Sequence, residues 1–321
     1  MTRLSIAMAT FNGARFLPEQ IDSLLRQTRK PDEIVISDDG STDGTMELLH
    51  DYAARFPELF KVSRNSTQLG YRENFSEASS RCSGDWVLFC DQDDYWFPTK
   101  IERVLDAVAS RPEILLWIND MEMADEALRP LGHSVFDNVR RMNLPLSWSG
   151  PGCGTAVRSD LLKLALPFPP ERKGHDDWIN GFALLLGVRG EIDEVLQYYR
   201  RHEGATTDTV ASGSRPTGRF ALLRSEAFKP VTAGWTEDQA VLNLVESRLS
   251  ERPLSSALRE RAPPTLRKLR NQRSALRSRL QIISLPRWRR WLPIANFWRT
   301  RGYDEFGGAK SMLKDLIRRR E

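Results

Sequence analysis

Three carboxylates stand within four residues in the segment Asp91-Gln92-Asp93-Asp94. Side chains this close repel one another unless a cation lies between them. Their hard oxygen ligands suit Mg²⁺ or Mn²⁺, which complete their coordination shells with water and phosphate oxygens. The segment directly follows the apolar run 86–90, which is typical of a buried strand. It therefore predicts a divalent-cation site for a phosphorylated ligand; the alternative is a solvated acidic loop.

A second polar segment, from Asp38 to Asp43, follows another strand-like run at 33–36. The Asp39 carboxylate could accept a hydrogen bond from a nucleobase N–H or a ribose hydroxyl. The Asp-Gly-Ser sequence is also typical of a turn that begins a helix, with Ser41 and Asp43 as caps. The two interpretations are compatible, because different side chains carry them.

The hydrophobic pattern predicts the scaffold that positions these segments. Strand-like runs at 4–9, 33–36, 60–62 and 86–90 alternate with amphipathic helix patterns. Such alternation predicts an α/β domain with a mostly parallel sheet, in which ligands bind beyond the carboxyl ends of the strands. Because a last strand is expected at 195–200, we predict a catalytic domain over 1–210. A basic, mainly helical region is expected over 211–321.

Charge is distributed unevenly along the 321 residues. Residues 256–321 hold 18 Lys and Arg against 5 Asp and Glu, so the rest of the chain carries −9 within a total of +4. Trp288, Trp291 and Trp298 stand among these arginines. Such a tail is typical of contact with an anionic membrane, or of a helical subdomain that packs its tryptophans inward. Nucleic acid is not expected as a partner, because the remainder is acidic.

Cysteine content and hydropathy bear on location. Cys82, Cys90 and Cys153 are too few and too scattered for a disulfide framework or a zinc cluster, which favours a reducing compartment. The amino terminus lacks the apolar segment of a signal peptide, and no run of apolar residues is long enough for a membrane span. We therefore expect a cytoplasmic protein, either in solution or peripheral on the inner face of the plasma membrane.

A set of short motifs runs through residues 1–205. They are Thr10-Phe11-Asn12-Gly13, Ser37-Asp38-Asp39-Gly40-Ser41-Thr42-Asp43, Asn65 with Leu69-Gly70, Gly84-Asp85-Trp86, Asp91-Gln92-Asp93-Asp94-Tyr95-Trp96 and Pro98-Thr99-Lys100-Ile101. Their combination and order resemble the family 2 glycosyltransferases, and the Asp-Gln-Asp-Asp-x-Trp form resembles the rhamnosyltransferase-like branch. The resemblance implies a GT-A fold, a Mn²⁺ or Mg²⁺ cofactor and sugar transfer with inversion.

The resemblance also implies residue roles on the donor side. Asp93 would hold the metal, and His202, in a Tyr-Arg-x-His element, would be a further metal or diphosphate ligand. Phe11 stands where the family often has Tyr, which preserves stacking but removes a phenol hydrogen bond. The residues implied to bind the nucleotide-diphosphate sugar are Thr10, Phe11, Asn12, Asp39, Asp91, Asp94, Arg200 and Arg201.

On the acceptor side, the resemblance implies a general base in the segment His175-Asp176-Asp177-Trp178. An acceptor hydroxyl is a weak nucleophile, so a carboxylate must take its proton as the new bond forms. The family pattern favours Asp176, but Asp177 occupies a Trp position and leaves the choice open; a helix N-cap is the structural alternative. Gly152, Cys153 and Trp178 would lie on the acceptor side.

The branch resemblance favours dTDP-rhamnose as donor, with a UDP-sugar as the other candidate. The implied acceptor is a growing cell-surface polysaccharide or a lipid-linked glycan. One rival interpretation is a haloacid-dehalogenase-like phosphatase that uses Asp91 and Asp93, although two strand–helix units precede these residues and Asp38 to Asp43 would then have no function. A non-catalytic membrane-docking protein is the second rival. Dehydrogenase and P-loop classes are excluded, because neither glycine-rich fingerprint is present.

Overall fold

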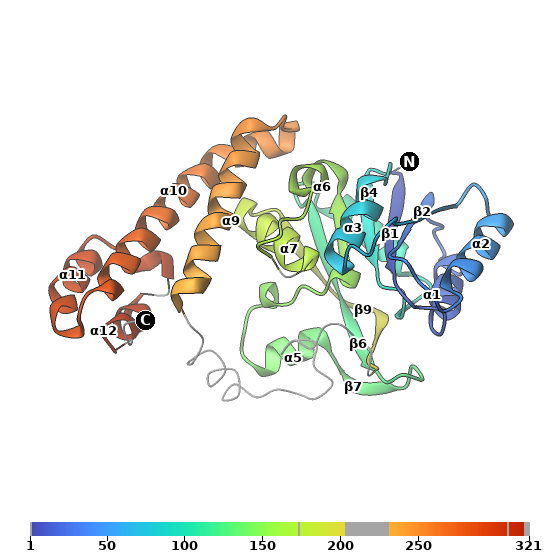
Figure 1. Cartoon of the computed structure of the whole chain (residues 1–321), viewed down its shortest axis with the longest axis horizontal. Helices are drawn as coiled ribbons and strands as arrows, with labels where there is room; N and C mark the ends of the chain where they lie inside the picture. Colours follow the sequence, from blue (N-terminus) through green and yellow to red (C-terminus); the bar gives the residue numbers. More distant parts are fainter. Residues whose placement is uncertain (1, 173, 203–230, 307, 318–321) are drawn as a thin grey trace. The chain divides into compact units, whose positions relative to one another are not determined.

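The computed structural model describes residues 2–172, 174–202, 231–306 and 308–317. The chain forms two compact units, residues 1–225 and 226–321 (Figure 1). The boundary expected at residue 210 lies outside the described residues. No described helix is both long and apolar enough to cross a membrane.

The first half of the sheet is parallel, as predicted. Its strand order is β3-β2-β1-β4, and helices connect the strands along the chain. The strands are β1 (Leu4–Thr10), β2 (Glu33–Asp38), β3 (Phe60–Arg64) and β4 (Trp86–Cys90). The connecting helices are α1 (Leu17–Leu25), α2 (Thr45–Arg55) and α3 (Tyr71–Ser80). Strands β1, β2 and β4 are buried along almost their whole lengths, and β4 is accordingly apolar at every position rather than alternating.

The second half of the sheet is mixed. It continues in the order β8-β6-β9-β5, with β7 paired to β6. The strands are β5 (Tyr95–Trp96), β6 (Leu116–Ala124), β7 (Pro130–Ser134), β8 (Thr155–Arg158) and β9 (Arg189–Arg200). The helices are α4 (Lys100–Ser110), α5 (Val135–Arg141), α6 (Ser159–Ala165) and α7 (His175–Leu186), and the short 3-10 turns are η1 (Leu146–Trp148) and η2 (Gly152–Gly154). Strand β8 runs antiparallel to both β4 and β6.

Both faces of the sheet are covered, which fixes where the strand ends point. One face packs on apolar side chains of α1, α2 and α4, among them Ile21, Leu49 and Val104. On the other face, Phe89 of β4 packs against Phe75 of α3 and His175 of α7. The strands β1 to β4 are therefore held in place from both sides, and their carboxyl ends form one common edge.

One local prediction needs correction. Ser41 and Asp43 were expected to cap the next helix, but α2 begins at Thr45 after the N-cap residue Gly44, and its N-cap makes no side-chain hydrogen bond. The Ser41 hydroxyl instead donates to Asp38, and Asp43 accepts from the amide and hydroxyl of Thr45. Strand β6 extends over nine residues, and its polar residues Asn119 and Asp120 are buried within the sheet.

The carboxyl-terminal unit is helical, as predicted. It contains α9 (Val231–Glu251), α10 (Ser256–Ser284), α11 (Arg287–Arg299) and α12 (Ala309–Ile317), with a short turn η3 (Asp304–Phe306). Arg270 and Arg273 of α10 pair with Glu246 of α9. The buried Arg279 guanidinium forms two hydrogen bonds of 2.8 Å with Asp315, and buried Arg290 donates to three main-chain carbonyls. Part of the tail's positive charge therefore holds the unit together.

The buried carboxylate of Glu33, at the start of β2, yields a stability prediction. It accepts hydrogen bonds from the Ser5 hydroxyl (2.5 Å), the Ser83 amide (2.6 Å) and Lys61. Burial alone would raise the pKa of Glu33, but the bonds from Lys61, Ser5 and Ser83 outweigh it and lower the pKa to about 2. Because the folded pKa lies below the unfolded value, this stabilisation is present above about pH 4.5 and is lost as the pH falls toward 2.

Glu33→Gln should therefore lower the free energy of unfolding by about 2 kcal/mol at pH 7, the typical cost of disrupting a buried charged hydrogen-bond set. The difference from the wild type should shrink between pH 4.5 and pH 2. Urea unfolding at several pH values measures this, with the exposed Glu58→Gln as the control. A difference that is constant with pH would contradict the assignment.

Candidate active site

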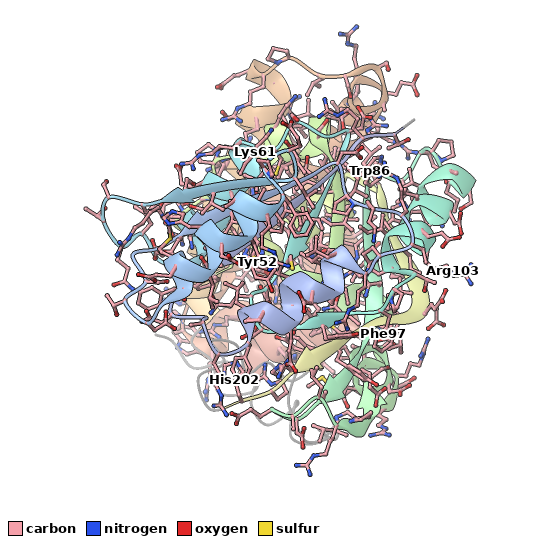
Figure 2. The ribbon with its side chains drawn as sticks, turned by 90° about the vertical axis from the view of Figure 1, so that its right-hand side faces the viewer. Tyr52, Lys61, Trp86, Phe97, Arg103 and His202 are labelled. Carbon is pink, nitrogen blue, oxygen red and sulfur yellow. The ribbon has the colours of Figure 1, made fainter. Side chains whose placement is uncertain are left out.

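A cavity of about 1030 Å³ opens at the carboxyl edge of the sheet. It is lined by the ends of β1, β4 and β9, the first turns of α3 and α7, and the loop between α5 and β8. In Figure 2, Lys61 and Trp86 lie near the amino ends of their strands, and His202 lies at the opposite edge of the sheet. The cavity therefore lies where the two acidic segments were expected to meet a ligand.

The end of β4 and the end of β9 bring together the two side chains that were predicted to hold the metal. The Nε2 atom of His202 lies 2.8 Å from Oδ2 of Asp93. The His202 ring packs on Phe16, with 4.8 Å between ring centroids. The main-chain carbonyl of Asp93 accepts a 2.6 Å hydrogen bond from Nε of Arg200, which holds the acidic loop against β9. Two segments 109 residues apart thus converge on one point.

The charge around Asp91 fits a cation. Burial, and then the negative charges of Asp93 and Asp176, raise the pKa of Asp91 to about 7. Three carboxylates therefore face the same small volume, and a cation among them would offset their repulsion. Carboxylate oxygens with one imidazole nitrogen are a donor set that Mn²⁺ accepts well and Mg²⁺ can accept. The residues present fit the implied divalent metal.

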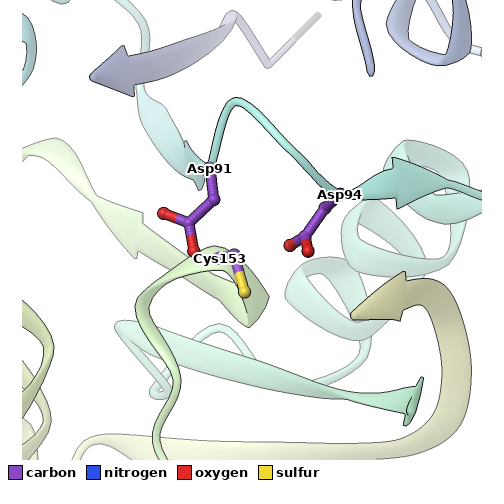
Figure 3. A group of neighbouring side chains, drawn as sticks. All are labelled: Asp91, Asp94 and Cys153. Carbon is purple, nitrogen blue, oxygen red and sulfur yellow. The ribbon is translucent and has the colours of Figure 1, made fainter. Parts of the chain in front are cut away.

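A neighbouring group fits such a cation less well. One donor atom each of Asp91, Asp94 and Cys153 lie within 4.8 Å of one another, and Figure 3 shows the sulfur between the two carboxylates. Burial raises the pKa of the Cys153 thiol well above its usual value, so the thiol stays protonated. A thiol is also a soft ligand, which Mg²⁺ and Mn²⁺ do not prefer. This group is better explained as buried hydrogen bonding behind the cavity.

Asp94 was expected to bind the donor, and the structure gives it a different function. Its side chain is fully buried, and its oxygens accept from Nε2 of Gln197 (2.9 Å) and the main-chain N–H of Arg200 (3.1 Å). Asp94 does not line the cavity in the part of the chain that the structure describes. It instead fastens the acidic loop to β9, which positions Asp93 beside His202.

The predicted nucleotide-binding loop at the end of β1 is held from several sides. The amide N–H of Phe11 donates to Oε1 of Gln92 (2.9 Å), and Nε2 of Gln92 donates back to its carbonyl (3.0 Å). The Phe11 ring is 41% exposed and lines the cavity, so it is available for stacking. Thr10 is buried, with its hydroxyl donating to Asp38. Thr10 can therefore offer main-chain atoms more readily than its hydroxyl.

Asn12 and Asp39 shape this loop as well as lining the cavity. Asn12 adopts a positive φ of 48°, its amide donates to the Ser41 hydroxyl, and its Oδ1 accepts from the Thr42 amide. Asp39 accepts from Nδ2 of Asn65 (3.0 Å) and from the amides of Leu69 (2.7 Å) and Gly70 (2.8 Å). A carboxylate has lone pairs beyond these bonds, so Asp39 can still accept from a nucleobase.

The two arginines at the end of β9 differ. The guanidinium of Arg200 donates to the carbonyls of Asp93 and Glu126 and to the carboxylate of Glu19. Arg200 lines the cavity, but each of its guanidinium nitrogens already donates to a protein group, which argues against the donor-binding role implied for it. Arg201 lines the cavity, and its guanidinium lies 5.3 Å from the Tyr199 ring centroid. Arg201 is the better placed of the two for a diphosphate.

The two candidate bases also differ in their surroundings. Asp176 lies on the first turn of α7, where its Oδ1 accepts from the Asp177 amide (2.8 Å). Its charge contributes to the raised pKa of Asp91, so it faces the acidic loop across the cavity. Asp177 is exposed, and its Oδ2 pairs with Arg172 at 3.1 Å. The geometry therefore favours Asp176 as the group that meets an acceptor hydroxyl.

Of the three residues expected on the acceptor side, only Gly152 lines the cavity. A Cβ atom at Gly152 would lie 2.4 Å from Nε2 of His175, so the close approach requires glycine. Cys153 is fully buried behind the wall. Trp178 is also buried, donates from Nε1 to the Ala165 carbonyl (2.9 Å) and stacks on Phe182. Both side chains therefore belong to the core, and Cys153 and Trp178 could support an acceptor site only from behind the cavity wall.

The structure adds lining residues that the sequence interpretation did not assign. Gln92 was part of a quoted motif, and its pairing with Phe11 depends on a contact across 81 positions. Trp148, an aromatic residue in the polar segment Ser147 to Gly150, was a signal that could have been noticed. Further unassigned lining residues include Arg15, Phe16, Tyr71, Asn74, Ser149, His175 and Asn180.

Comparison with solved structures identifies this architecture as the GT-A glycosyltransferase fold. Staphylococcus aureus TarS, solved in complex with UDP, superposes with a TM-score of 0.53 at 19% identity, over 98% of this chain and 80% of TarS. The mannosyltransferase PcManGT of Pyrobaculum calidifontis, solved with GDP-Man and Mn²⁺, gives a TM-score of 0.50 at 18% identity, over 98% of this chain and 85% of the other. At these identities the likeness establishes the fold.

The sequence comparison points to the same class of protein. Residues 5–155, just under half of the chain, match the glycosyl transferase family 2 model. The dTDP-rhamnosyl transferase RfbG of Shigella flexneri is 24% identical over 238 residues, which are 69% of this chain and 81% of RfbG. An uncharacterized protein of Mycobacterium bovis is 34% identical over 112 residues, and the matched part spans about a third of its length.

Proposed function

We propose that this protein is an inverting glycosyltransferase that moves a sugar from a nucleotide-diphosphate donor to an acceptor hydroxyl. The observation that carries the proposal is the convergence of Asp93 and His202 at 2.8 Å in a cavity that Asp176 also lines. The predicted metal ligands and a candidate base thus line one cavity with the exposed Phe11 ring. The match of residues 5–155 to the family 2 model supports this proposal.

The chain's residues divide the chemistry as follows. Asp93 and His202, with Asp91 beside them, would hold Mn²⁺ or Mg²⁺, whose charge would stabilise the diphosphate as a leaving group. Phe11 stacks on the base. Asp39 and main-chain atoms of the Thr10–Asn12 loop form hydrogen bonds with the edge of the base. Asp176 takes the proton of the acceptor hydroxyl as that oxygen bonds to the anomeric carbon. The bond from this carbon to the diphosphate breaks, the nucleoside diphosphate leaves, and the anomeric configuration inverts.

For the donor, we propose dTDP-rhamnose, with a UDP-sugar as the alternative. RfbG, named a dTDP-rhamnosyl transferase, supports the first, and TarS, solved with UDP, supports the second. A cell-surface polysaccharide or lipid-linked glycan under construction at the cytoplasmic face of the membrane would be the acceptor.

A thermal-shift panel tests the donor assignment. The protein is heated with dTDP-rhamnose, UDP-glucose, UDP-N-acetylglucosamine or GDP-mannose, each with and without Mn²⁺. A true donor at about 100 times its dissociation constant should stabilise the fold by about 2.7 kcal/mol. The stabilisation should require Mn²⁺. Equal melting temperatures across the whole panel would contradict donor binding.

We also propose that α11 docks the protein on an anionic membrane. Trp288 is 70% exposed, Trp291 61% and Leu292 63%, and their spacing places them on one face of the helix, the tryptophan face. Arg290 and Ile294 on the opposite face are buried. The alternative interpretation was a helical subdomain that packs its tryptophan side chains inward. The exposure of Trp288 and Trp291 does not fit that alternative. Exposed tryptophans beside Arg287 and Arg289 suit the headgroup region of a bilayer.

The double substitution Trp288→Ala and Trp291→Ala should weaken binding to phosphatidylglycerol vesicles about tenfold or more, because two interfacial side chains are lost. The melting temperature should stay unchanged, since both side chains are exposed. Co-sedimentation measures the binding, and Leu313→Ala on α12, 57% exposed, is the control. Unchanged sedimentation of the double variant, or equal binding to neutral phosphatidylcholine vesicles, would contradict the docking surface.

A further inference from the structure

An exposed tryptophan projects from the cavity wall on the side of Asp176. Trp148, the last residue of η1, is 60% exposed and lines the cavity. A large aromatic side chain that stays exposed loses the free energy of burial, about 25 cal/mol for each Å² left in water. Exposed aromatic surface inside a cavity is the type of surface that ligands cover.

The loop that carries Trp148 is built as a fixed support. The Arg189 guanidinium, whose side chain is 1% exposed, donates to three carbonyls of the loop, those of Leu146, Ser147 and Ser149. Nδ2 of Asn180 donates both to the carbonyl of Gly150 (3.2 Å) and to that of Asp176 (2.9 Å). Asn180 thus ties the loop to the helix turn that carries the candidate base. A ligand on Trp148 would meet a preorganised surface.

The same wall holds buried polar atoms that lack a hydrogen-bond partner among the described residues. They are Oγ of Ser149, Oδ1 of Asn180 and both ring nitrogens of His175. These side chains are 1%, 5% and 4% exposed, and all three line the cavity. A buried polar group without a hydrogen-bond partner destabilises the folded protein, so each such group calls for an explanation. Three on one wall indicate that a ligand or water completes their hydrogen bonds.

The chemistry of this wall selects the kind of ligand. Ser149 and Asn180 are neutral, and burial lowers the pKa of His175, which keeps its imidazole neutral at physiological pH. Neutral donors and acceptors suit hydroxyl groups and do not suit a phosphate or a carboxylate. An aromatic face suits the C–H face of a pyranose ring. A lipid chain would leave the polar atoms without partners.

We propose that Trp148, Ser149, Asn180 and His175 form a subsite for a sugar ring of the acceptor, with Trp148 as its stacking platform. This inference rests on the proposed function and deepens it, because it names the acceptor as a glycoside that is recognised by its terminal sugar. Asn180 places this ring beside Asp176, whose carboxylate then reaches one of the sugar's hydroxyls.

Saturation-transfer NMR with simple glycosides tests the subsite. The wild-type protein, saturated with Mn²⁺ and UDP or dTDP, is mixed with methyl glycosides of rhamnose, glucose, mannose, galactose and N-acetylglucosamine. At least one should receive saturation, most strongly at its ring C–H protons. Trp148→Ala should weaken its binding about fivefold to tenfold, the usual value of an aromatic contact. Trp148→Phe should restore most of the affinity. Ser149→Ala should weaken glycoside binding about threefold or more, although this substitution removes no hydrogen bond within the described part of the chain.

Controls separate the possible failures. Phe56→Ala removes an exposed aromatic ring outside the cavity and should bind the glycosides as the wild type does. Calorimetry with Mn²⁺ and the nucleoside diphosphate should give the same affinity for the wild type and all variants. If the nucleotide binds but no glycoside does, or if Trp148→Ala binds glycosides as tightly as the wild type, the subsite is wrong and water satisfies these atoms. A wild type that binds neither nucleoside diphosphate would contradict the proposed function itself.

Discussion

Asp93→Asn should abolish Mn²⁺-dependent binding of the nucleotide donor. The substitution keeps the shape of the side chain but removes the anionic charge from the oxygen that lies 2.8 Å from Nε2 of His202. Loss of a partner outside the ligand shell typically weakens metal binding 10- to 100-fold, so loss of a ligand should exceed about 100-fold. Isothermal calorimetry with UDP or dTDP, in the presence and absence of Mn²⁺, measures the effect.

Two further variants sharpen this test. His202→Ala removes the other member of the pair and should weaken the same Mn²⁺-dependent binding. Asp51→Asn, an exposed carboxylate on α2 that pairs with Arg55, should leave it unchanged. If Asp93→Asn retains the Mn²⁺-dependent affinity of the wild type, the metal is held elsewhere or is not used.

Asp176→Asn should lower turnover about 10²- to 10⁴-fold, the usual range for losing a general base, while donor affinity stays near that of the wild type. An amide cannot take the proton of the acceptor hydroxyl. Turnover is measured as release of nucleoside diphosphate, and donor affinity is measured by calorimetry on the same preparations.

Asp177→Asn is the matched control, because Asp177 neighbours Asp176 but is exposed and paired with Arg172. It should change turnover no more than about twofold, as is common for exposed ion pairs that contribute little. A large loss in Asp177→Asn with normal turnover in Asp176→Asn would assign the base to Asp177. Normal turnover in both variants would place the base outside this segment.

The parallel half of the fold was predictable because its signals are local. Runs such as 86–90 are continuously apolar, since a strand buried on both faces needs no alternation. Their polar ends then had to share one edge of the sheet, which located Asp39, Asp91 and Asp93 correctly in the cavity wall. The four-residue strand β8 gave no such signal, because a glycine-rich turn precedes it and its partners β4 and β6 lie far away in the sequence.

Local sequence patterns could not distinguish the functions of neighbouring residues. Asp93 and Asp94 are equivalent by type and spacing, and only the contacts of Asp94 with Gln197 and Arg200 show that it serves the core. Arg200 and Arg201 are likewise adjacent, and the packing of β9 decides which one is occupied by protein groups. Trp148 faces the cavity because Arg189, 41 positions later, holds its loop. Such long-range contacts must be seen in the structure.

Donor hydrolysis followed by NMR tests the central claim most directly. The protein is incubated with the nucleotide sugar that gives the largest thermal shift, with Mn²⁺ and with water in place of the acceptor. Slow release of nucleoside diphosphate and free sugar in equal amounts is expected, with the inverted anomer formed first. The release should require Mn²⁺ and disappear in Asp93→Asn. Release of inorganic phosphate without nucleoside diphosphate would instead favour a phosphatase, and a donor that stays intact, or a sugar first formed with its configuration retained, would contradict inverting transfer.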